Sequence, residues 1–395
     1  MSAALQTAKL GEIAELNPRL AESLESNAPV SFVPMSAVTA ETASTTTGAE
    51  RQYSEVSKGY TPFRDGDVLV AKITPCFENG KIAQATISHR IGFGSTEFHV
   101  VRPINGKSDA RYLLHFLRQE RIRRDGERKM TGSAGQRRVP EHFLAGIEIP
   151  LPPLAEQRRI AELLDQAEAL RAKRRAALAQ LDTLIQAIFI DMFGDPATNP
   201  KGWRRNALCG ITSKITDGEH LNPVFSAVGM PIVMAGNVLD DLVDLRTAKT
   251  VDSTLGERFR KKCNPEKGDL LLVSRGATIG RLCSIDFTDR FCLMGSVILI
   301  KPDSGLLDKK YLSALLKHPL MWEKLYAASG SSAQQAIYLK DIKRLSCPLP
   351  PLDLQREFAH RVAAVEKLKT AYRASLAEMD ALFASLQHRA FRGEL

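Results

Sequence analysis

Two long stretches of the chain place apolar residues with the period of a coiled-coil helix. Residues 155–192 contain neither proline nor glycine, and apolar or long-stemmed side chains recur there at alternating spacings of three and four. These are Ile160, Leu163, Ala167, Leu170, Arg174, Ala177, Leu181, Leu184 and Ile188. Residues 353–391 repeat the rhythm at Val362, Val365, Lys369, Tyr372, Leu376, Met379, Phe383 and Leu386. We expect two helices of about 57 Å each, at ~1.5 Å per residue.

An apolar seam of this length needs a partner, and the other helix of the same chain can supply one. We therefore expect the two helices to form an antiparallel coiled coil. The alternative is that each helix packs only on its neighbouring globular segment.

The segments before each helix have the mixed pattern of an α/β fold. Strand-like runs at 67–73 and 98–102 precede a helical pattern at 110–124, and the order recurs at 269–274, 296–301 and 309–325. We expect a mixed α/β protein with two globular domains, 1–153 and 196–351. The central long helix then occupies 154–195 and the C-terminal one 352–395.

An internal repeat relates the two halves. The sequence Pro-Leu-Pro-Pro-Leu at 150–154, followed by Gln157-Arg158, returns at 348–352, followed by Gln355-Arg356. Upstream, residues 131–136 align with 329–334, and the Gly-Asp strand at 66–70 aligns with 268–272. Two similar but non-identical units on one chain suit a bipartite target with two different halves.

Composition limits the class of protein. The chain of 395 residues carries a formal net charge of +9, which favours polyanionic partners. No run approaches 18 apolar residues and the N-terminus lacks the pattern of a signal peptide, so we expect a cytoplasmic protein with no membrane partner. The six cysteines show no C-x-x-C spacing, which argues against zinc ribbons and redox dithiols.

Motifs for catalysis are missing. The glycine-containing run at 276–281 lacks the Lys-Ser/Thr end of a P-loop, and the Asn-Pro pairs lack the rest of an amino-methyltransferase motif. Gly-x-Ser-x-Gly and metal-ligand histidine spacings are also absent. These absences favour a binding protein, with no catalytic, cofactor-binding or metal-binding residues of its own.

The polar and basic loops that recur at equivalent positions are the candidate DNA-binding residues. In the first half they are Lys72, Thr74, Asn79, Lys81, Ser133, Gln136, Arg137 and Arg138. In the second half they are Ser274, Arg275, Thr278, Arg281, Ser331, Ser332, Gln334 and Gln335. Such side chains contact phosphates, and Arg and Gln can also bond bidentately to guanine and adenine. For each residue taken alone, an ordinary turn or surface role is an equal alternative.

The ordered, duplicated set of motifs resembles the specificity subunit of type I restriction–modification systems. The likeness is carried by 66–81, Thr216-Asp217-Gly218-Glu219-His220, both Pro-Leu-Pro-Pro-Leu segments with their Gln-Arg helices, and residues 189–196. It implies two target recognition domains, each recognising one half of a split asymmetric site in double-stranded DNA. It further implies that the coiled coil sets the spacing between the halves and docks two methyltransferase subunits and motor-nuclease subunits.

By the same resemblance, adenine methylation and DNA cleavage belong to the partners. Those subunits would bind S-adenosylmethionine, ATP and Mg²⁺, and this chain would need no cofactor. Two alternatives stay open at this point: a coiled-coil scaffold protein without a DNA role, and a self-contained DNA methyltransferase or nuclease with an unrecognised site.

Overall fold

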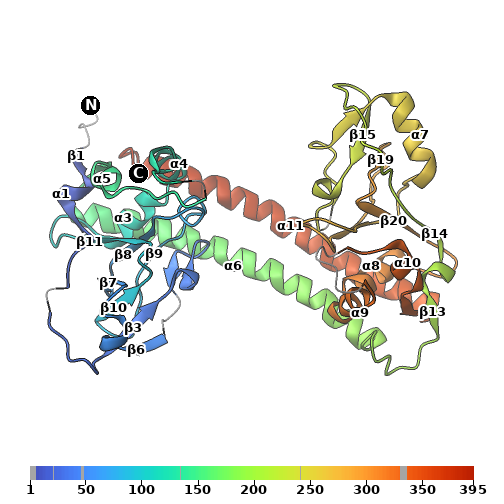
Figure 1. Cartoon of the computed structure of the whole chain (residues 1–395), viewed down its shortest axis with the longest axis horizontal. Coiled ribbons are helices and arrows are strands. Elements are labelled where there is room, and N and C mark those ends of the chain that lie inside the picture. The colour runs from blue at the N-terminus through green and yellow to red at the C-terminus, as the bar shows by residue number, and fades with distance from the viewer. Residues whose placement is uncertain (1–5, 21, 46–48, 134, 241, 330–335) are drawn as a thin grey trace. The chain divides into compact units, whose positions relative to one another are not determined.

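The computed structural model describes residues 6–20, 22–45, 49–133, 135–240, 242–329 and 336–395. Contacts divide the chain into two compact units. Unit 1 comprises Met1–Ala177 and Tyr372–Leu395, and unit 2 comprises Leu178–Ala371. The two long helices, α6 (Leu154–Phe193) and α11 (Leu352–Ala390), each contribute residues to both units (green and red in Figure 1).

Unit 1 contains two sheets and a short ladder. The six-stranded sheet has the order β2 (Ala14–Leu16), β11 (Phe98–Pro103), β8 (Val68–Ala71), β9 (Ile82–Gln84), β5 (Ser44–Thr45), β4 (Val38–Thr39). The four-stranded sheet has the order β6 (Ala49–Gln52), β3 (Pro29–Val33), β10 (Ile91–Gly94), β7 (Thr61–Arg64). The ladder joins β1 (Thr7–Lys9) to β12 (Glu148–Pro150). The short helices are α1 (Leu10–Ile13), α2 (Tyr53–Val56), α3 (Ala110–Leu117), α4 (Glu120–Lys129) and α5 (Glu141–Ala145), with the 3₁₀ turn η1 (Met35–Ala37).

Unit 2 repeats this plan with fewer strands. One sheet has the order β14 (Thr212–Asp217), β20 (Val297–Pro302), β17 (Leu270–Val273), β18 (Leu282–Ser284), and the other β16 (Lys249–Val251), β15 (Met230–Val233), β19 (Cys292–Leu293). A ladder joins β13 (Arg205–Ala207) to β21 (Ser346–Pro348). The helices are α7 (Ser253–Cys263), α8 (Lys309–Lys317), α9 (Pro319–Ser329) and α10 (Leu339–Arg344), with the 3₁₀ turns η2 (Leu208–Gly210) and η3 (Ala235–Asn237). The predicted mixed α/β class is confirmed.

Matching contacts in the two units confirm the internal repeat. The Tyr112 hydroxyl donates to the Pro150 carbonyl at 2.7 Å, and the Tyr311 hydroxyl donates to the Pro348 carbonyl at the same distance. Each hydroxyl thereby ties the first helix after the sheet to the proline segment that precedes a long helix. The repeated prolines are thus part of a repeated anchoring contact.

The buried glutamine of each Gln-Arg pair makes the second repeated contact. Gln157 accepts a hydrogen bond from the Asp109 amide (3.0 Å) and donates to the carbonyls of Lys107 (3.0 Å) and Pro152 (2.9 Å). Gln355 makes the equivalent three bonds in unit 2. The side chains are 1% and 0% exposed, so each glutamine satisfies backbone groups that water cannot reach.

Replacing Gln157 by Leu is expected to lower the free energy of unfolding by about 3 kcal/mol, because buried backbone groups lose their partner at a cost of roughly 1–3 kcal/mol each. Urea denaturation would measure the effect. The exposed Gln166 of the same helix provides the control: Gln166→Leu should change stability little. Equal losses in both variants would contradict the anchoring role.

The two long helices run antiparallel where they pack together. In unit 1, Arg171 of α6 lies over the Phe383 ring and Arg174 lies over Tyr372, so position rises on α6 as it falls on α11. In unit 2, Lys369 pairs with Asp182 at 2.7 Å, although the lysine side chain is only 2% exposed. The predicted antiparallel coiled coil is confirmed.

The predicted seam of α6 is partly wrong. Leu170 and Leu184 are 55% and 43% exposed, whereas Leu164, outside the predicted positions, is fully buried. Near each end of α6 the helix packs on a globular domain as well as on α11, which shifts the buried face. In the described part of the chain, α6 alone is long and apolar enough to cross a membrane by length and composition. Its apolar Phe189 and Phe193 lie instead in the core of unit 2.

The helical stretches predicted at 110–124 and 309–325 are each broken in two. In unit 2 the break falls at His318, whose extended backbone (φ −69°, ψ 130°) is what a following proline, Pro319, favours. In unit 1 the equivalent residue Gln119 has a similar backbone conformation (φ −57°, ψ 138°), although no proline follows it. All four predicted strand runs are confirmed, as β8, β11, β17 and β20.

Candidate nucleic-acid interface

In unit 1 the structure brings the two predicted basic segments together beside strand β8. The Val139 amide donates to the Lys72 carbonyl (2.8 Å) and the Thr74 amide donates to the Arg137 carbonyl (3.0 Å). The backbone of Arg138 also forms isolated antiparallel β-bridges with Ile73 and Thr131. The loop after β8 and the turn at 131–138 therefore form one surface.

Arg138 is held in place by a carboxylate. Its guanidinium bonds both oxygens of Glu97 at 2.7–3.2 Å, and this bonding holds the pKa of Glu97 below its usual value. The Arg138 side chain remains 41% exposed, and the half-buried Lys72 lies close enough to affect the same carboxylate. Arg138 is thus oriented at the surface while retaining an accessible face.

Two other predicted residues of this loop use their side chains in hydrogen bonds within the protein. The Thr74 hydroxyl donates to Glu78 (2.8 Å), and the Lys81 ammonium donates to the Met35 carbonyl (2.9 Å). Asn79, by contrast, is exposed. Of the predicted residues in the turn, Ser133, Gln136 and Arg137 also have accessible side chains, that of Arg137 being 42% exposed.

Two further arginines join this surface and were not singled out from the sequence. Arg124 and Arg128 of α4 line a cavity of about 310 Å³ together with Glu127 and Arg137. Their side chains are 67% and 78% exposed. Residues 118–138 hold eight basic and three acidic side chains, which was the available signal, but helical packing decides which of these arginines face Arg137.

Unit 2 builds the same arrangement with different side chains. The Ile337 amide donates to the Ser274 carbonyl (2.8 Å), as the Val139 amide does to the Lys72 carbonyl. The backbones of Arg275 and Ala336 form an isolated β-bridge. The Ser274 hydroxyl is buried and donates to the Ser296 carbonyl (3.0 Å). Arg275 is exposed, and Ala336 takes the place that Arg138 holds in unit 1.

The remaining predicted residues of unit 2 are less accessible or fall outside the description. Thr278 is half-buried, with its hydroxyl 3.5 Å from the Ala235 carbonyl. Arg281 lies 3.9 Å from Asp240 and is 36% exposed. Ser331, Ser332, Gln334 and Gln335 lie outside the described residues.

The motif at 216–220 forms a polar cluster in unit 2. Asp217 pairs with His220 (2.7 Å) and Lys262 (3.1 Å). Burial raises the pKa of Asp217, but the hydrogen bonds from His220 and Lys262 outweigh it and lower the pKa overall. The His220 side chain is 51% exposed, so the cluster offers hydrogen-bond donors at the surface. Within the described ranges, no group of three or more His, Cys, Asp or Glu residues could hold a metal ion.

His99 of β11 is buried beneath the candidate surface of unit 1, where it bonds the turn at Val139. This histidine makes the stability of the protein depend on pH. Its Nε2 bonds the Val139 carbonyl at 2.8 Å, and burial lowers its pKa. As pH falls below about 6.5, the unfolded chain therefore binds a proton before the folded one does, and stability is lost.

We expect the free energy of unfolding to fall between pH 7 and pH 5.5 by up to about 1.4 kcal/mol per pH unit for this histidine. His99→Gln should make the decline shallower in urea titrations, whereas substitution of the exposed His360 should not. A decline that is unaltered in His99→Gln would assign the pH dependence to other groups.

Comparison with known proteins places these observations in a family. The model for the type I restriction modification DNA specificity domain matches residues 4–180 and 228–378. The chain is similar to the type I restriction enzyme EcoAI specificity subunit of Escherichia coli, with 37% identity over 45% of this chain and 31% of that protein. It is also similar to the EcoEI specificity subunit of E. coli, with 42% identity over 38% of this chain and 25% of that one.

The matches to these two relatives thus span about a third and a quarter of their lengths. A solved chain from a study of complex assembly and conformational transition of the type I R-M system shares the fold, with a TM-score of 0.56 and 22% identity. That similarity covers 99% of this chain and 98% of the other. The family model covers most of the sequence and both units, so the chain belongs to the type I restriction modification DNA specificity domain family.

Proposed function

We propose that this chain is the DNA-recognition subunit of a type I restriction–modification complex and is not itself an enzyme. Residues 1–153 and 196–351 act as two target recognition domains, each recognising one half of a bipartite, asymmetric site in double-stranded DNA. The helical segments 154–195 and 352–395 set the distance between the halves.

The observation that carries this proposal is that one loop arrangement is built twice with different side chains. The bond from Val139 to Lys72 recurs from Ile337 to Ser274, while Arg138 is replaced by Ala336. A repeated frame with altered donors is suited to two different half-sites, because side-chain donors specify bases. The accessible residues Gln136, Arg137 and Arg275 are the strongest candidates for base or phosphate contacts.

Exposed leucines on the long helices support two copies of one partner. Leu170 and Leu382 belong to unit 1, and Leu368 and Leu184 occupy the corresponding repeat positions in unit 2; they are 55%, 58%, 42% and 43% exposed. Equivalent apolar positions in both units suit two identical partners, which we take to be methyltransferase subunits. Motor-nuclease subunits complete the complex, and S-adenosylmethionine, ATP and Mg²⁺ bind to the partners. We place the complex in the cytoplasm, where it meets DNA.

Methylome sequencing of a host with and without this chain, with its methyltransferase partner present throughout, tests the proposal. We expect a new N6-methyladenine motif, split by a fixed unspecified gap, only when the chain is present. No new motif despite intact partner expression would leave a scaffold or an enzyme with its own site.

A further inference from the structure

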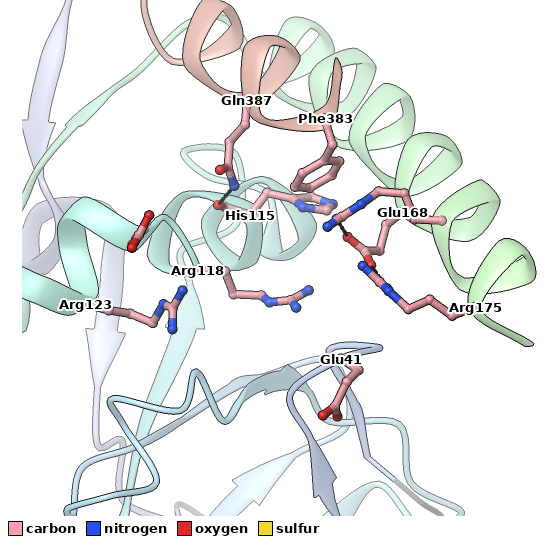
Figure 2. Close-up of a pocket in the computed structure, with 10 residues that line it drawn as sticks. Glu41, His115, Arg118, Arg123, Glu168, Arg175, Phe383 and Gln387 are labelled. Atoms are coloured by element: carbon pink, nitrogen blue, oxygen red, sulfur yellow. Dashed lines mark hydrogen bonds and ion pairs between the residues drawn. The ribbon is translucent and has the colours of Figure 1, made fainter. Parts of the chain in front are cut away.

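A polar cavity of about 340 Å³ lies inside unit 1, among α3, α4, α6 and α11 (Figure 2). It borders the candidate DNA-binding loop after β8, because its lining residue Arg123 donates to the Glu78 carbonyl of that loop. Four of its lining residues are arginines: Arg118, Arg123, Arg171 and Arg175. The question is which of these charges are already neutralised within the protein.

Two of the arginines are paired. Arg175 lies 3.2 Å from Glu168 (Figure 2) and 3.6 Å from Asp380. Arg171 also bonds Glu168 and lies 2.6 Å from Asp380. Two carboxylates thus balance two guanidinium groups, and this network joins α6 to α11.

The other two arginines, Arg118 and Arg123, form no ion pair with a carboxylate in the described part of the chain. In the described part of the chain, no carboxylate lies within 4.0 Å of Arg118 or Arg123, and each donates to a backbone carbonyl only, that of Ala40 (2.6 Å) and that of Glu78 (2.9 Å). The Nε of Arg123 is buried without an acceptor, and burial lowers the pKa of Arg118. Buried cationic donors without acceptors are costly, and a bound anion would supply what they lack.

Comparison with the internal repeat shows which part of this polar lining is particular to unit 1. Lys317 takes the place of Arg118 and keeps its bond, donating to the Asp240 carbonyl at 2.9 Å. The Glu168–Arg171 pair also has a counterpart in Glu366 and Lys369. Three other lining positions are apolar in unit 2, with Ala314 for His115, Trp322 for Arg123 and Phe189 for Gln387, whereas Arg373 corresponds to Arg175. The polar character of His115, Arg123 and Gln387 is therefore particular to unit 1.

We propose that this cavity binds a phosphate group, held by Arg118 and Arg123. The planar guanidinium fork matches phosphate oxygens bidentately, and the volume falls in the range of small-molecule sites, about 300–1,000 Å³. The exposed Glu41, which lines the cavity on the side opposite the helices, limits how much negative charge the cavity accepts (Figure 2). The phosphate comes either from a small phosphorylated molecule or from a DNA backbone.

Calorimetry on the full chain with pyrophosphate as the probe tests the site. We expect Arg118→Gln and Arg123→Gln each to weaken binding about tenfold or more, since charge-assisted hydrogen bonds are the strong ones. Arg118→Lys, which keeps the charge and loses the fork, should bind more tightly than Arg118→Gln and more weakly than the original chain, and Glu41→Gln should raise the affinity. Arg159, a surface residue of α6 paired with Glu156, is the control, and Arg159→Gln should bind as the original chain does. Thermal melting followed by circular dichroism verifies that each variant is folded.

Repeating the titration with target duplex DNA present distinguishes the two sources, and this arm alone rests on the proposed function. If pyrophosphate binds equally well with DNA present, the ligand is a small molecule. If DNA displaces it, and Arg118→Gln reduces the salt dependence of DNA binding by about one phosphate contact, the source is the backbone. No binding of pyrophosphate to the original chain, or equal loss in Arg159→Gln, overturns the site.

Discussion

Exchanging residues 1–153 for the recognition domain of another family member is expected to change one half of the methylated target and leave the other half and the gap intact. Each unit has its own core: Tyr112 and Leu164 belong to that of unit 1, and Tyr311 and Phe358 to that of unit 2. Because the candidate DNA contacts of each half lie on separate cores, replacing one core leaves the other set in place. Methylome sequencing would show the change directly.

The structure indicates where the exchange must be made. Phe391, near the end of α11, packs against Tyr112 and Phe116 with ring centroids 5.1 and 5.0 Å apart. The incoming domain must therefore accept Phe391, or residues 372–395 must be exchanged together with 1–177. Losing a buried aromatic contact of this size costs roughly 3–5 kcal/mol, a large fraction of the free energy of unfolding of a typical domain.

The control is the hybrid that carries both segments of unit 1 from the donor. We expect it to methylate the same hybrid target as the simple exchange, with greater stability. A target altered in both halves would mean that the two domains do not recognise DNA independently, and the modular proposal would fail.

The repeat and the long helices were predictable because their signals are local and strong. A heptad rhythm without proline or glycine needs no tertiary information, and the Pro-Leu-Pro-Pro-Leu segment marks the start of each helix. The role of Gln157 was not predictable, because its partners Lys107 and Asp109 lie about 50 residues away. The prediction that Leu170 lies in the apolar seam was wrong for the same reason, because the buried face of the helix depends on which elements pack against it.

The candidate DNA-binding surface was likewise only partly predictable from the sequence. Alignment of the two halves predicted that two segments of each unit belong to one surface, and repeated backbone bonds do bring these segments together in each unit. It did not identify which side chains are available. Lys81 bonds a carbonyl of η1, and Ser274 bonds Ser296, so both partners come from elsewhere in the fold. A polar residue in a glycine-rich loop is as suitable for stabilising the loop as for contacting DNA.

Deleting one heptad from each long helix is expected to shorten the unspecified gap of the target by about 3 base pairs. Seven residues of helix span about 10.5 Å at ~1.5 Å each, and B-DNA rises about 3.4 Å per pair. The segments to remove are 173–179 of α6 and 372–378 of α11. Because the helices are antiparallel, these segments lie opposite one another, midway between the Arg171–Asp380 pair of unit 1 and the Asp182–Lys369 pair of unit 2.

Removing both segments keeps each of these ion pairs in register, so both recognition sequences should persist while their separation changes. Removing 173–179 alone provides the control, because it slides one helix by two turns against the other. That variant must break the interhelical ion pair of one unit, Arg171–Asp380 or Asp182–Lys369, although Glu168 and Glu366 remain beside the two cations, and it takes the apolar contacts between the helices in that unit out of register. We expect it to lose methylation altogether. A double deletion that methylates the original target with the original gap would show that the helices do not set the spacing.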